Sequence, residues 1–458
     1  MSKILIVGAG VTGAAIHHFL RSLAPASSVM PSIVLWEASS ELGGRMSTDH
    51  HKALHCDLGA QYITKNSAEC DDVYDHLLQK RVFALLDNTA VSGMRADHQV
   101  GTHYIAPQGT SSIVAALAEG AEVVYNKRLT GIDLDLATKK IVASSTRTGA
   151  GAGAGGGGGA QEREEFDVVV LSMLAPQVAA VQGNFLAFQP PPLQTEAELD
   201  LAGRLRRVRY SSRFALAAYY ALSTEEKKAV QESVPWKAKY VFDDEVLRFV
   251  SMENFKYVQA QGSPSKRARV EVQVGVGAGV GAAEVGANDG NGNGNTDGDG
   301  DLEGLAVLMH TSVPFGLAQP EALRGEAAAV PAVEEQILQS LGRTLPALAV
   351  YDSKRVKTRL LGWEQSQISR GFYHVDAPKG APPAPLGAPA LVISKEALAT
   401  LEGAGSAGAT VGATAGATAT ISGGSPGIVL AGDAFTESNF EGCMRSARAA
   451  AHIVMGLP

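Results

Sequence analysis

Short runs of consecutive apolar residues mark both ends of the chain and its middle. They lie within residues 4–7, 33–36, 167–171 and 427–431. Continuous apolar runs of this length are typical of parallel strands that are buried on both faces. The pattern also predicts a helix over residues 14–23 and a final helix over about residues 442–455. We therefore expect both ends of the chain to build one parallel sheet flanked by helices.

A different pattern occupies the centre of the chain. Residues 210–220, 246–252 and 305–310 are β-rich with alternating polar positions, which predicts antiparallel strands of a second domain. A helix near residues 331–341 is expected to cover these strands. The predicted fold class is therefore α/β, with a Rossmann-like domain on a parallel sheet and a mixed, largely antiparallel α+β domain beside it.

Three segments of low complexity interrupt these patterns. Residues 149–160 contain only Gly and Ala, residues 274–301 are rich in Gly, Asn and Asp, and residues 403–426 are rich in Gly, Ala, Thr and Ser. Such compositions bury too little apolar surface to offset the entropy lost on ordering. We expect all three to be disordered surface loops.

The first apolar run leads directly into Gly8-x-Gly10-x-x-Gly13. Gly8 permits a tight turn, Gly10 lets the backbone approach a pyrophosphate, and Gly13 allows the helix to pack closely on the strand. The helix start offers N–H groups and a partial positive charge to the phosphates. Glu37 ends the second run, where an acid can accept hydrogen bonds from both ribose hydroxyls. The spacing predicts a dinucleotide site.

Two further motifs indicate which dinucleotide is bound. Gly43-Gly44-Arg45 resembles the Gly-Gly-Arg spacing of the FAD-containing amine oxidase superfamily. In this position Arg45 can reach a phosphate or the flavin. The last apolar run ends in Gly432-Asp433. In FAD proteins of this topology an Asp at this position bonds the ribityl chain. The start of the final helix, near Cys443 and Met444, is expected to direct its dipole at the flavin N1/O2 edge. The predicted cofactor is FAD, bound non-covalently.

The motifs also set the expected domain boundaries. Residues 1–75, 104–190 and 427–458 are assigned to the FAD-binding domain, and residues 76–103 and 191–426 to the substrate domain. The N-terminal residues 1–20 could pass for a signal peptide. We interpret them as structure, because cleavage would remove the first strand together with the phosphate-binding loop.

Composition narrows the choice of partners and location. The 458 residues carry a net charge of −8, which argues against a nucleic-acid role. No apolar run reaches the length of a membrane span. Cys56, Cys70 and Cys443 lie in no disulfide or metal spacing. The expectations are a reduced, cytoplasmic location and no bound metal, no nucleic-acid partner and no membrane association. The oligomeric state is not predicted.

Sequence islands along nearly the whole chain resemble the renalase family. They are Asp57-Leu-Gly-Ala-Gln-Tyr-Ile-Thr64, Ala106-Pro-Gln-Gly109 with Ser111-Ser112, Tyr210-Ser-Ser-Arg213, His310-Thr311 with Val313-Pro-Phe-Gly316, Trp363 with Ser366-Gln367, and Ser438-Asn439-Phe440 with Gly442-Cys443. The resemblance implies an FAD-dependent oxidoreductase that oxidises 2-dihydro and 6-dihydro isomers of NAD(P) to NAD(P)+. Hydride passes to flavin N5, and dioxygen is then reduced to hydrogen peroxide.

The resemblance also extends the set of candidate site residues. It implies that Thr12, Gln61 and Tyr62 join Arg45 in contacting FAD. Loss of hydride from a dihydropyridine restores aromaticity and needs no general base, so no catalytic side chain is assigned. Among substrate candidates, Arg213 is expected to offset phosphate charge, or else to form a structural ion pair. His310 is expected near the flavin or substrate, or else in the core, and the same two alternatives hold for Trp363.

Two other functions are weighed against this one. Flavin amine oxidases place an aromatic residue just after the Gly that opens the last helix, where this chain has Cys443. Several also tether the flavin through a Cys in the region of residues 403–426, which here contain none. Both departures count against amine oxidation. The other alternative, a non-catalytic flavin-binding redox sensor, is excluded by nothing in the sequence.

Overall fold

The first of two six-stranded sheets joins the two ends of the chain. The computed structural model describes residues 2–24, 29–94, 101–148, 161–190, 199–256, 304–373, 388–403 and 426–457. The strand order of this sheet is β21-β22-β13-β1-β2-β9, and every neighbouring pair except β21–β22 is parallel. The strands are β1 (Lys3–Val7), β2 (Ser32–Trp36), β9 (Glu122–Val124), β13 (Val168–Leu171), β21 (Ala390–Ser394) and β22 (Pro426–Ala431).

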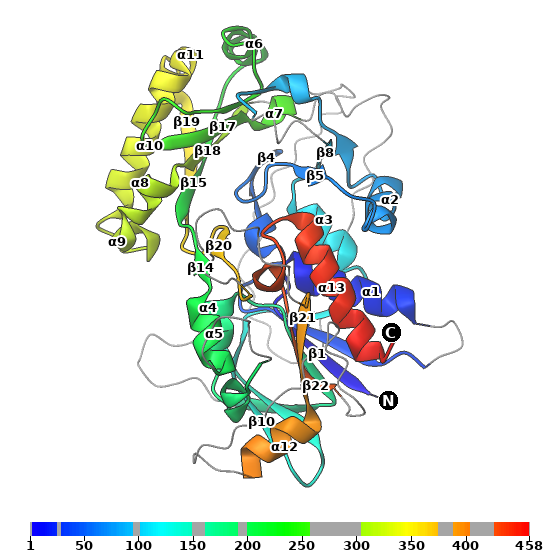
Figure 1. The fold of residues 1–458 in the computed structure, drawn as a ribbon. Coiled ribbons are helices and arrows are strands. Elements are labelled where there is room, and N and C mark those ends of the chain that lie inside the picture. Colours follow the sequence, from blue (N-terminus) through cyan, green and yellow to red (C-terminus); the bar gives the residue numbers. More distant parts are fainter. Residues whose placement is uncertain are drawn as a thin grey trace, which may run out of the picture.

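Both faces of this sheet are buried, which explains the continuous apolar runs. One face packs against α1 (Val11–Leu23), α3 (Ser111–Leu117) and α13 (Phe440–Met455). Helices α1 and α13 lie side by side across it (Figure 1). The other face packs against a three-stranded sheet and short helices. These elements are β10 (Lys127–Asp135), β11 (Lys140–Arg147), β12 (Glu162–Phe166), α4 (Ala175–Ala179), α5 (Leu201–Arg207) and α12 (Lys395–Gly403). The predicted Rossmann-like parallel sheet is confirmed.

The second six-stranded sheet has the order β19-β15-β18-β17-β16-β7 and is antiparallel except for the β16–β7 pair. Its strands are β7 (Val91–Ser92), β15 (Arg213–Tyr220), β16 (Ala238–Tyr240), β17 (Leu247–Met252), β18 (Leu305–Thr311) and β19 (Arg355–Trp363). Its outer face is covered by helices that stand at the upper left of Figure 1. They are α6 (Thr224–Glu232), α8 (Val313–Leu317), α9 (Pro320–Leu323), α10 (Val330–Thr344) and α11 (Pro346–Ala349).

The inner face of the second sheet is turned toward the first domain. It packs on a hairpin of β3 (Thr48–His51) and β4 (Leu54–Asp57), which follows the N-terminal motifs in the chain. Smaller elements link the two sheets. They are β5 (Ile63–Lys65), α2 (Asp71–Gln79), β6 (Ala84–Leu85), β8 (Thr102–Ile105), α7 (Glu253–Lys256), and the pair β14 (Arg209–Tyr210) and β20 (Ile368–Arg370).

The structure differs from several sequence expectations. Strands β15 and β18 are buried almost throughout, without the expected polar alternation, because helices cover one face and the β3–β4 hairpin covers the other. Helix α1 begins three residues earlier than predicted, and α13 begins two residues earlier. Strand β21, which lies within the range 191–426 assigned to the substrate domain, pairs with β22 in the first sheet.

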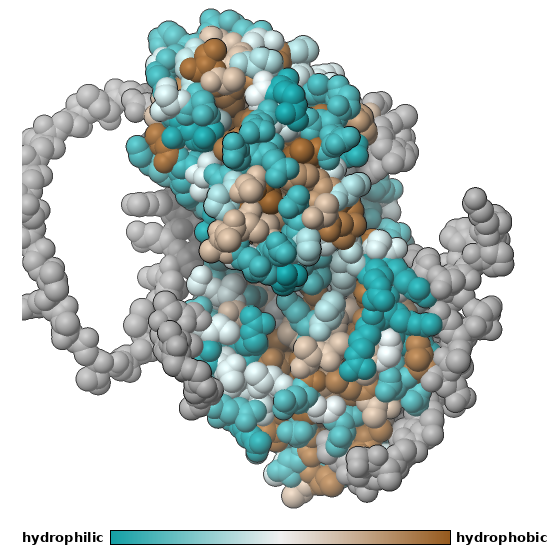
Figure 2. Space-filling model, turned by 90° about the vertical axis from the view of Figure 1, so that its left-hand side faces the viewer, coloured by the Kyte–Doolittle hydropathy of each residue, from teal (hydrophilic) through white to brown (hydrophobic). Residues whose placement is uncertain are grey.

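The segments 149–160 and 274–301, and nearly all of 403–426, lie outside the described residues. Polar and apolar residues are interspersed over the surface seen in Figure 2. Among the described residues, none of the helices combines the length and apolarity that a bilayer crossing requires.

Candidate functional site

The glycine-rich loop lies at the carboxyl end of β1, between that strand and α1. Gly8 has a φ of +100° and donates its N–H to the Trp36 carbonyl at 2.9 Å. A Cβ on Gly13 would overlap the Gly8 carbonyl oxygen. A Cβ on Gly10, in contrast, would meet just one group of the described residues, the Gly43 carbonyl, at 3.9 Å. The positive φ therefore requires glycine at position 8 and packing requires it at position 13, whereas the bare backbone at Gly10 leaves room for a ligand.

Glu37 follows β2 and turns its carboxylate toward this loop. One oxygen accepts the Ala9 N–H at 2.8 Å, and the other accepts the N–H and hydroxyl of Ser39, each at 2.8 Å. A carboxylate offers about four acceptor positions, so these three bonds fix its orientation and leave capacity for a ribose hydroxyl. The predicted ribose acid is thus held beside the loop.

The Gly-Gly-Arg motif lies against the same loop. Gly43 forms a bridge with Gly10 and donates its N–H to the Ala9 carbonyl at 3.3 Å. The Arg45 guanidinium, which starts from this turn, donates to Asp433 Oδ2 at 2.6 Å and to the Ser366 carbonyl at 3.2 Å. The two motifs that sequence reasoning placed on one cofactor are therefore in direct contact.

Burial shapes the electrostatics of this ion pair. The side chain of Asp433 is only 5% exposed and that of Arg45 28% exposed. Burial acts to lower the pKa of Arg45, but the charge and hydrogen bond of Asp433 outweigh it, so the pKa is raised. Asp433 Oδ2 also accepts the Ser438 hydroxyl at 3.0 Å. Arg45 is therefore a fixed cation at neutral pH.

Gly432 precedes this carboxylate and has a φ of +139°, a conformation that residues with a side chain rarely adopt. No protein atom of the described residues lies within 4 Å of the position of a Cβ there. Its N–H donates to the buried Ser446 hydroxyl of α13 at 2.8 Å, which fixes the turn after β22. Like Gly10, Gly432 presents bare backbone to open space.

The start of α13 carries two further candidates, Cys443 and Met444. The helix is capped by Asn439, whose side chain accepts the Gly442 N–H at 2.7 Å while its carbonyl accepts the Cys443 N–H at 3.1 Å. Both N–H groups are thus bonded at the helix start, and the expected direction of the helix dipole toward the flavin stays a prediction. Met444 is fully buried in the core. Burial and the Asp433 charge raise the pKa of the Cys443 thiol to about 11, against the effects of Arg45 and the Thr12 hydroxyl.

The loop after β4 carries the next two candidates. A Cβ on Gly59 would overlap the Arg45 carbonyl oxygen, so this loop runs directly against the Gly-Gly-Arg turn. The Gln61 side chain donates to the carbonyls of Asp57 and, at 3.2 Å, Gly59. Lys256 donates to the Gln61 side-chain oxygen at 3.4 Å. Gln61 therefore shapes its own loop, and its predicted contact with FAD stays a prediction.

Tyr62 reaches across to the second sheet. Its hydroxyl lies 2.6 Å from that of Tyr240 on β16, and its ring meets His103 edge-on. Burial, together with Tyr240, raises the pKa of Tyr62 far above its usual range. The hydroxyl pair joins the two domains and stays protonated at neutral pH.

His310 and Trp363 share one acceptor on the same loop. His310 Nε2 lies 3.0 Å from the Leu58 carbonyl, and Trp363 Nε1 donates to that carbonyl at 3.1 Å. Burial, followed by the nearby Arg213 cation, lowers the pKa of His310 to about 4. His310 is therefore neutral at physiological pH. Both side chains hold the loop that leads to Gln61 and Tyr62, which favours the structural alternative for each.

Arg213 begins β15 and lies opposite Trp363 on β19. Its Nη2 donates to the Gln367 side-chain oxygen at 3.1 Å, and no carboxylate of the described residues pairs with it. The expected alternative of a structural ion pair is thus not seen in this part of the chain. Burial, followed by the Arg248 cation, lowers the pKa of Arg213.

Sequence reasoning missed a buried ionic cluster formed by the end of β4 and by α7. Asp57, Glu253 and Lys256 are almost fully buried, and Lys256 Nζ lies 3.0 Å from Glu253 and 3.4 Å from Asp57. Asp57 also accepts the Thr48 hydroxyl at 2.8 Å and the Thr110 N–H at 2.7 Å. Asp57 belongs to a motif noted in the sequence, but no local signal marks its partners on α7, which lie 196 and 199 positions away.

Tyr210 and Tyr240 lie beside candidate site residues, and sequence reasoning did not select them. Tyr210 lies close enough to Asp433, Arg45 and Cys443 for their charges to act on its pKa, which burial raises. Its hydroxyl accepts the Ala175 N–H at 3.2 Å. Its place in the Tyr210-Ser-Ser-Arg213 motif was the only available signal.

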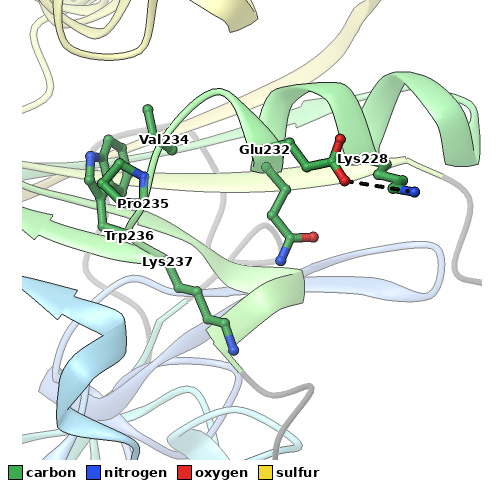
Figure 3. Close-up of a pocket in the computed structure, with 7 residues that line it drawn as sticks. Lys228, Glu232, Val234, Pro235, Trp236 and Lys237 are labelled. Atoms are coloured by element: carbon green, nitrogen blue, oxygen red, sulfur yellow. Dashed lines mark ion pairs between the residues drawn. The ribbon is translucent and has the colours of Figure 1, made fainter.

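A surface depression of about 410 Å³ lies elsewhere, beside α6 (Figure 3). Its lining includes the exposed Lys228–Glu232 pair, with 3.7 Å between the charged atoms. Trp236 there belongs to the core beneath the outer helices, and none of the motif residues lines the depression. Within the described residues, no cluster of three or more His, Cys, Asp or Glu side chains is arranged to hold a metal ion.

Comparison with known proteins agrees with this geometry. Residues 6–77 match the model of an NAD(P)-binding Rossmann-like domain. The chain is 26% identical to the renalase of Mus musculus over 455 residues, which cover 98% of this chain and 97% of that protein. The resemblance to renalases that the sequence islands indicated is confirmed.

Two solved structures share the fold. A candidate protoporphyrinogen oxidase from Exiguobacterium sp. 255-15 is 11% identical, with a TM-score of 0.55 over 98% of both chains. A putrescine oxidase variant with redesigned cofactor binding is 12% identical, with a TM-score of 0.50 over 99% of both chains. At these identities the likeness concerns the fold alone.

Proposed function

We propose that this chain is an FAD-dependent oxidase of the renalase type, which oxidises 2-dihydro and 6-dihydro isomers of NAD(P) to NAD(P)+ and reduces dioxygen to hydrogen peroxide. One observation carries the proposal. The glycine-rich loop, Arg45 and Asp433 meet at the carboxyl edge of the first sheet, in a chain that matches a renalase along almost its whole length. Ligands of open α/β sheets bind at this edge.

The residues at this edge fit FAD. Gly10 and Gly432 present bare backbone where no packing demands it, as close approach to a large ligand requires. Glu37 would bind the adenosine ribose, the start of α1 the pyrophosphate, and Asp433 the ribityl chain. Arg45, a fixed cation, would compensate negative charge on the phosphates or on the reduced flavin. When bound, the flavin accepts a hydride at N5 and passes electrons to dioxygen.

The side chains near this edge suit hydride transfer without a base. His310 is neutral and bonded to Leu58, and burial keeps the thiol of Cys443 and the hydroxyl of Tyr62 protonated. None of these three is poised to accept a proton at neutral pH. Oxidation of a dihydropyridine restores an aromatic ring when the hydride leaves, so position and electrostatics are sufficient.

Steady-state oxygen consumption tests the proposal. The protein purified with its flavin should consume dioxygen with 6-dihydro-NAD(P) and release one peroxide for each NAD(P)+ formed. Ordinary NADH, with its hydride at C4, is the matched control and should react far more slowly. Turnover of primary amines but not dihydropyridines would identify an amine oxidase, and turnover of neither would indicate a binding protein; both results contradict the proposal.

A further inference from the structure

Arg213 is a half-buried cation without a counter-charge among the described residues, on the inner face of the second sheet. Side chains alternate along a strand, so Arg213 shares this face with Ala215, Ala217 and Tyr219, which pack on the β3–β4 hairpin. Its Nη2 donates to the neutral amide of Gln367, and its Nε is buried with no hydrogen-bond partner among the described residues. A buried charged donor left unused is costly unless a ligand supplies the missing acceptor.

A second cation makes this arrangement more costly. Arg248 on β17 is near enough for its charge to act on Arg213. Arg248 Nη1 donates to the Val241 carbonyl at 3.3 Å, and its guanidinium carbon lies 5.3 Å from the centroid of the Phe242 ring. Within the part of the chain that the structure describes, no carboxylate forms an ion pair with either arginine. Two like charges that share no counter-ion are characteristic of a site for an anion.

The position of Arg213 connects this pair with the proposed cofactor edge. Its partner Gln367 follows Ser366, whose carbonyl accepts the Arg45 guanidinium at 3.2 Å. Arg213 also lies opposite Trp363 on the neighbouring strand. It is close enough to His310 for its charge to lower the pKa of that residue. The unused Nε donor thus lies in the layer of aromatic and polar side chains between the two domains.

We propose that Arg213, assisted by Arg248, binds the phosphate attached to the ribose of the dihydropyridine substrate, and so selects nucleotides over nucleosides. This inference rests on the proposed function. Guanidinium groups bind phosphate through paired N–H donors, and the Nε of Arg213 with its Nη2 offers such a pair. The chemical class of ligand is a phosphorylated pyridine nucleoside.

Binding of oxidised pyridine compounds tests the assignment independently of turnover. Nicotinamide mononucleotide and nicotinamide riboside, which differ by the phosphate, are titrated calorimetrically into the flavin-loaded protein. We expect the mononucleotide to bind about 10- to 100-fold more tightly, as charge-assisted hydrogen bonds imply. Arg213→Met should weaken binding of the mononucleotide, leave binding of the riboside unchanged, and so abolish the preference. Arg248→Met should reduce the preference. Arg324→Met, which breaks an exposed pair with Glu326, is the matched control and should leave it unchanged.

Three results would overturn the inference. The first is that the unaltered protein binds both compounds equally well. The second is that Arg213→Met lowers the affinity for both compounds by the same factor. The third is that the preference for the mononucleotide survives in that variant. If Arg213→Met loses its flavin, Arg213→Lys replaces it, and the preference must fall because an ammonium cannot reproduce the paired donors. Failure of the proposed function is distinguishable, since the 6-dihydro forms of both compounds would then leave the flavin oxidised whatever their affinities.

Discussion

Arg45 and Asp433 lie 388 positions apart in the sequence, and their side chains form an ion pair with 2.6 Å between nitrogen and oxygen. Arg45 follows the glycine turn beside β1, and Asp433 follows β22, two strands away in the same sheet. Parallel strands that end at one edge bring their following residues together. The pair therefore closes the candidate site from both ends of the chain.

A double-mutant cycle measures the coupling in this pair. Arg45→Met leaves Asp433 buried without its cation, and Asp433→Asn leaves Arg45 without its anion. Each change should lower the free energy of unfolding, and the double variant should lose less than the sum of the two. We expect a coupling energy of about 1–3 kcal/mol from urea unfolding of the flavin-free protein. Strict additivity would mean that the pair contributes nothing to stability.

Gly10 offers a direct test of cofactor binding. The nearest protein atom to a Cβ at this position is the Gly43 oxygen at 3.9 Å, so the fold should tolerate Gly10→Val, whereas the pyrophosphate should be excluded. The purified variant should lack the visible absorbance of flavin and keep a native circular dichroism spectrum. Gly342→Val in α10 is the control, because the nearest described atom to a Cβ there lies at 4.0 Å and the position belongs to the other domain. Full flavin absorbance in Gly10→Val would refute the assignment of the loop.

The buried ionic cluster predicts a stability that depends on pH. Lys256→Met removes the cation shared by Asp57 and Glu253, at an expected cost of about 3–5 kcal/mol at pH 8. Burial raises the pKa of Glu253, so its contribution to stability is present at low pH and is lost as the pH rises through the folded pKa. The decrease in the free energy of unfolding caused by Lys256→Met should thus be smaller at pH 5 than at pH 8, as measured by urea unfolding.

Lys354→Met provides the comparison for this cluster. Lys354 forms a partly exposed pair with Glu226, with 2.6 Å between the charged atoms. Such pairs contribute about 0–1 kcal/mol. The control should therefore lose little stability at either pH. A Lys256→Met variant with the same small loss at both pH values would show that the cluster is not a buried network.

The segment 149–160 is predicted to be dispensable. Its flanking strands β11 and β12 pair in register up to Ser145 and Glu162, and Arg147 forms an ion pair with Glu162 at 3.1 Å. The two attachment points therefore lie close enough for a short turn. Replacing the segment by Asn-Gly should leave flavin content and activity within about twofold, since loop length has a weak effect on stability. A large loss of either would reveal a role for the segment.

Local sequence was sufficient to place the candidate residues at the carboxyl edge of the first sheet. Gly8 to Gly13, Glu37 and Gly432-Asp433 each stand directly after a buried strand, so their positions follow from the strand pattern alone. The outer helix α10 followed from its sequence pattern in the same way. The start of α1 was missed because Gly10, which precedes it, has no capping side chain, whereas Asn439 before α13 is a favoured capping residue and did signal that start.

Contacts between distant segments could not be predicted. Lys256 and Glu253 reach Asp57 only because α7 packs against β4, and Tyr240 meets Tyr62 through a similar long-range approach. The absence of polar alternation in β15 also reflects tertiary burial of both faces. The roles of His310 and Trp363 depend on the Leu58 carbonyl, which no sequence pattern indicates.

Anaerobic reduction of the bound flavin tests the central claim most directly. One equivalent of 6-dihydro-NAD(P) is mixed with the oxidised protein in a stopped-flow instrument, with ordinary NADH and a primary amine in parallel. The account predicts rapid bleaching of the flavin by the 6-dihydro isomer, one NAD(P)+ per flavin, and slow or no bleaching by the other two compounds. A flavin that stays oxidised with the 6-dihydro isomer would contradict the account.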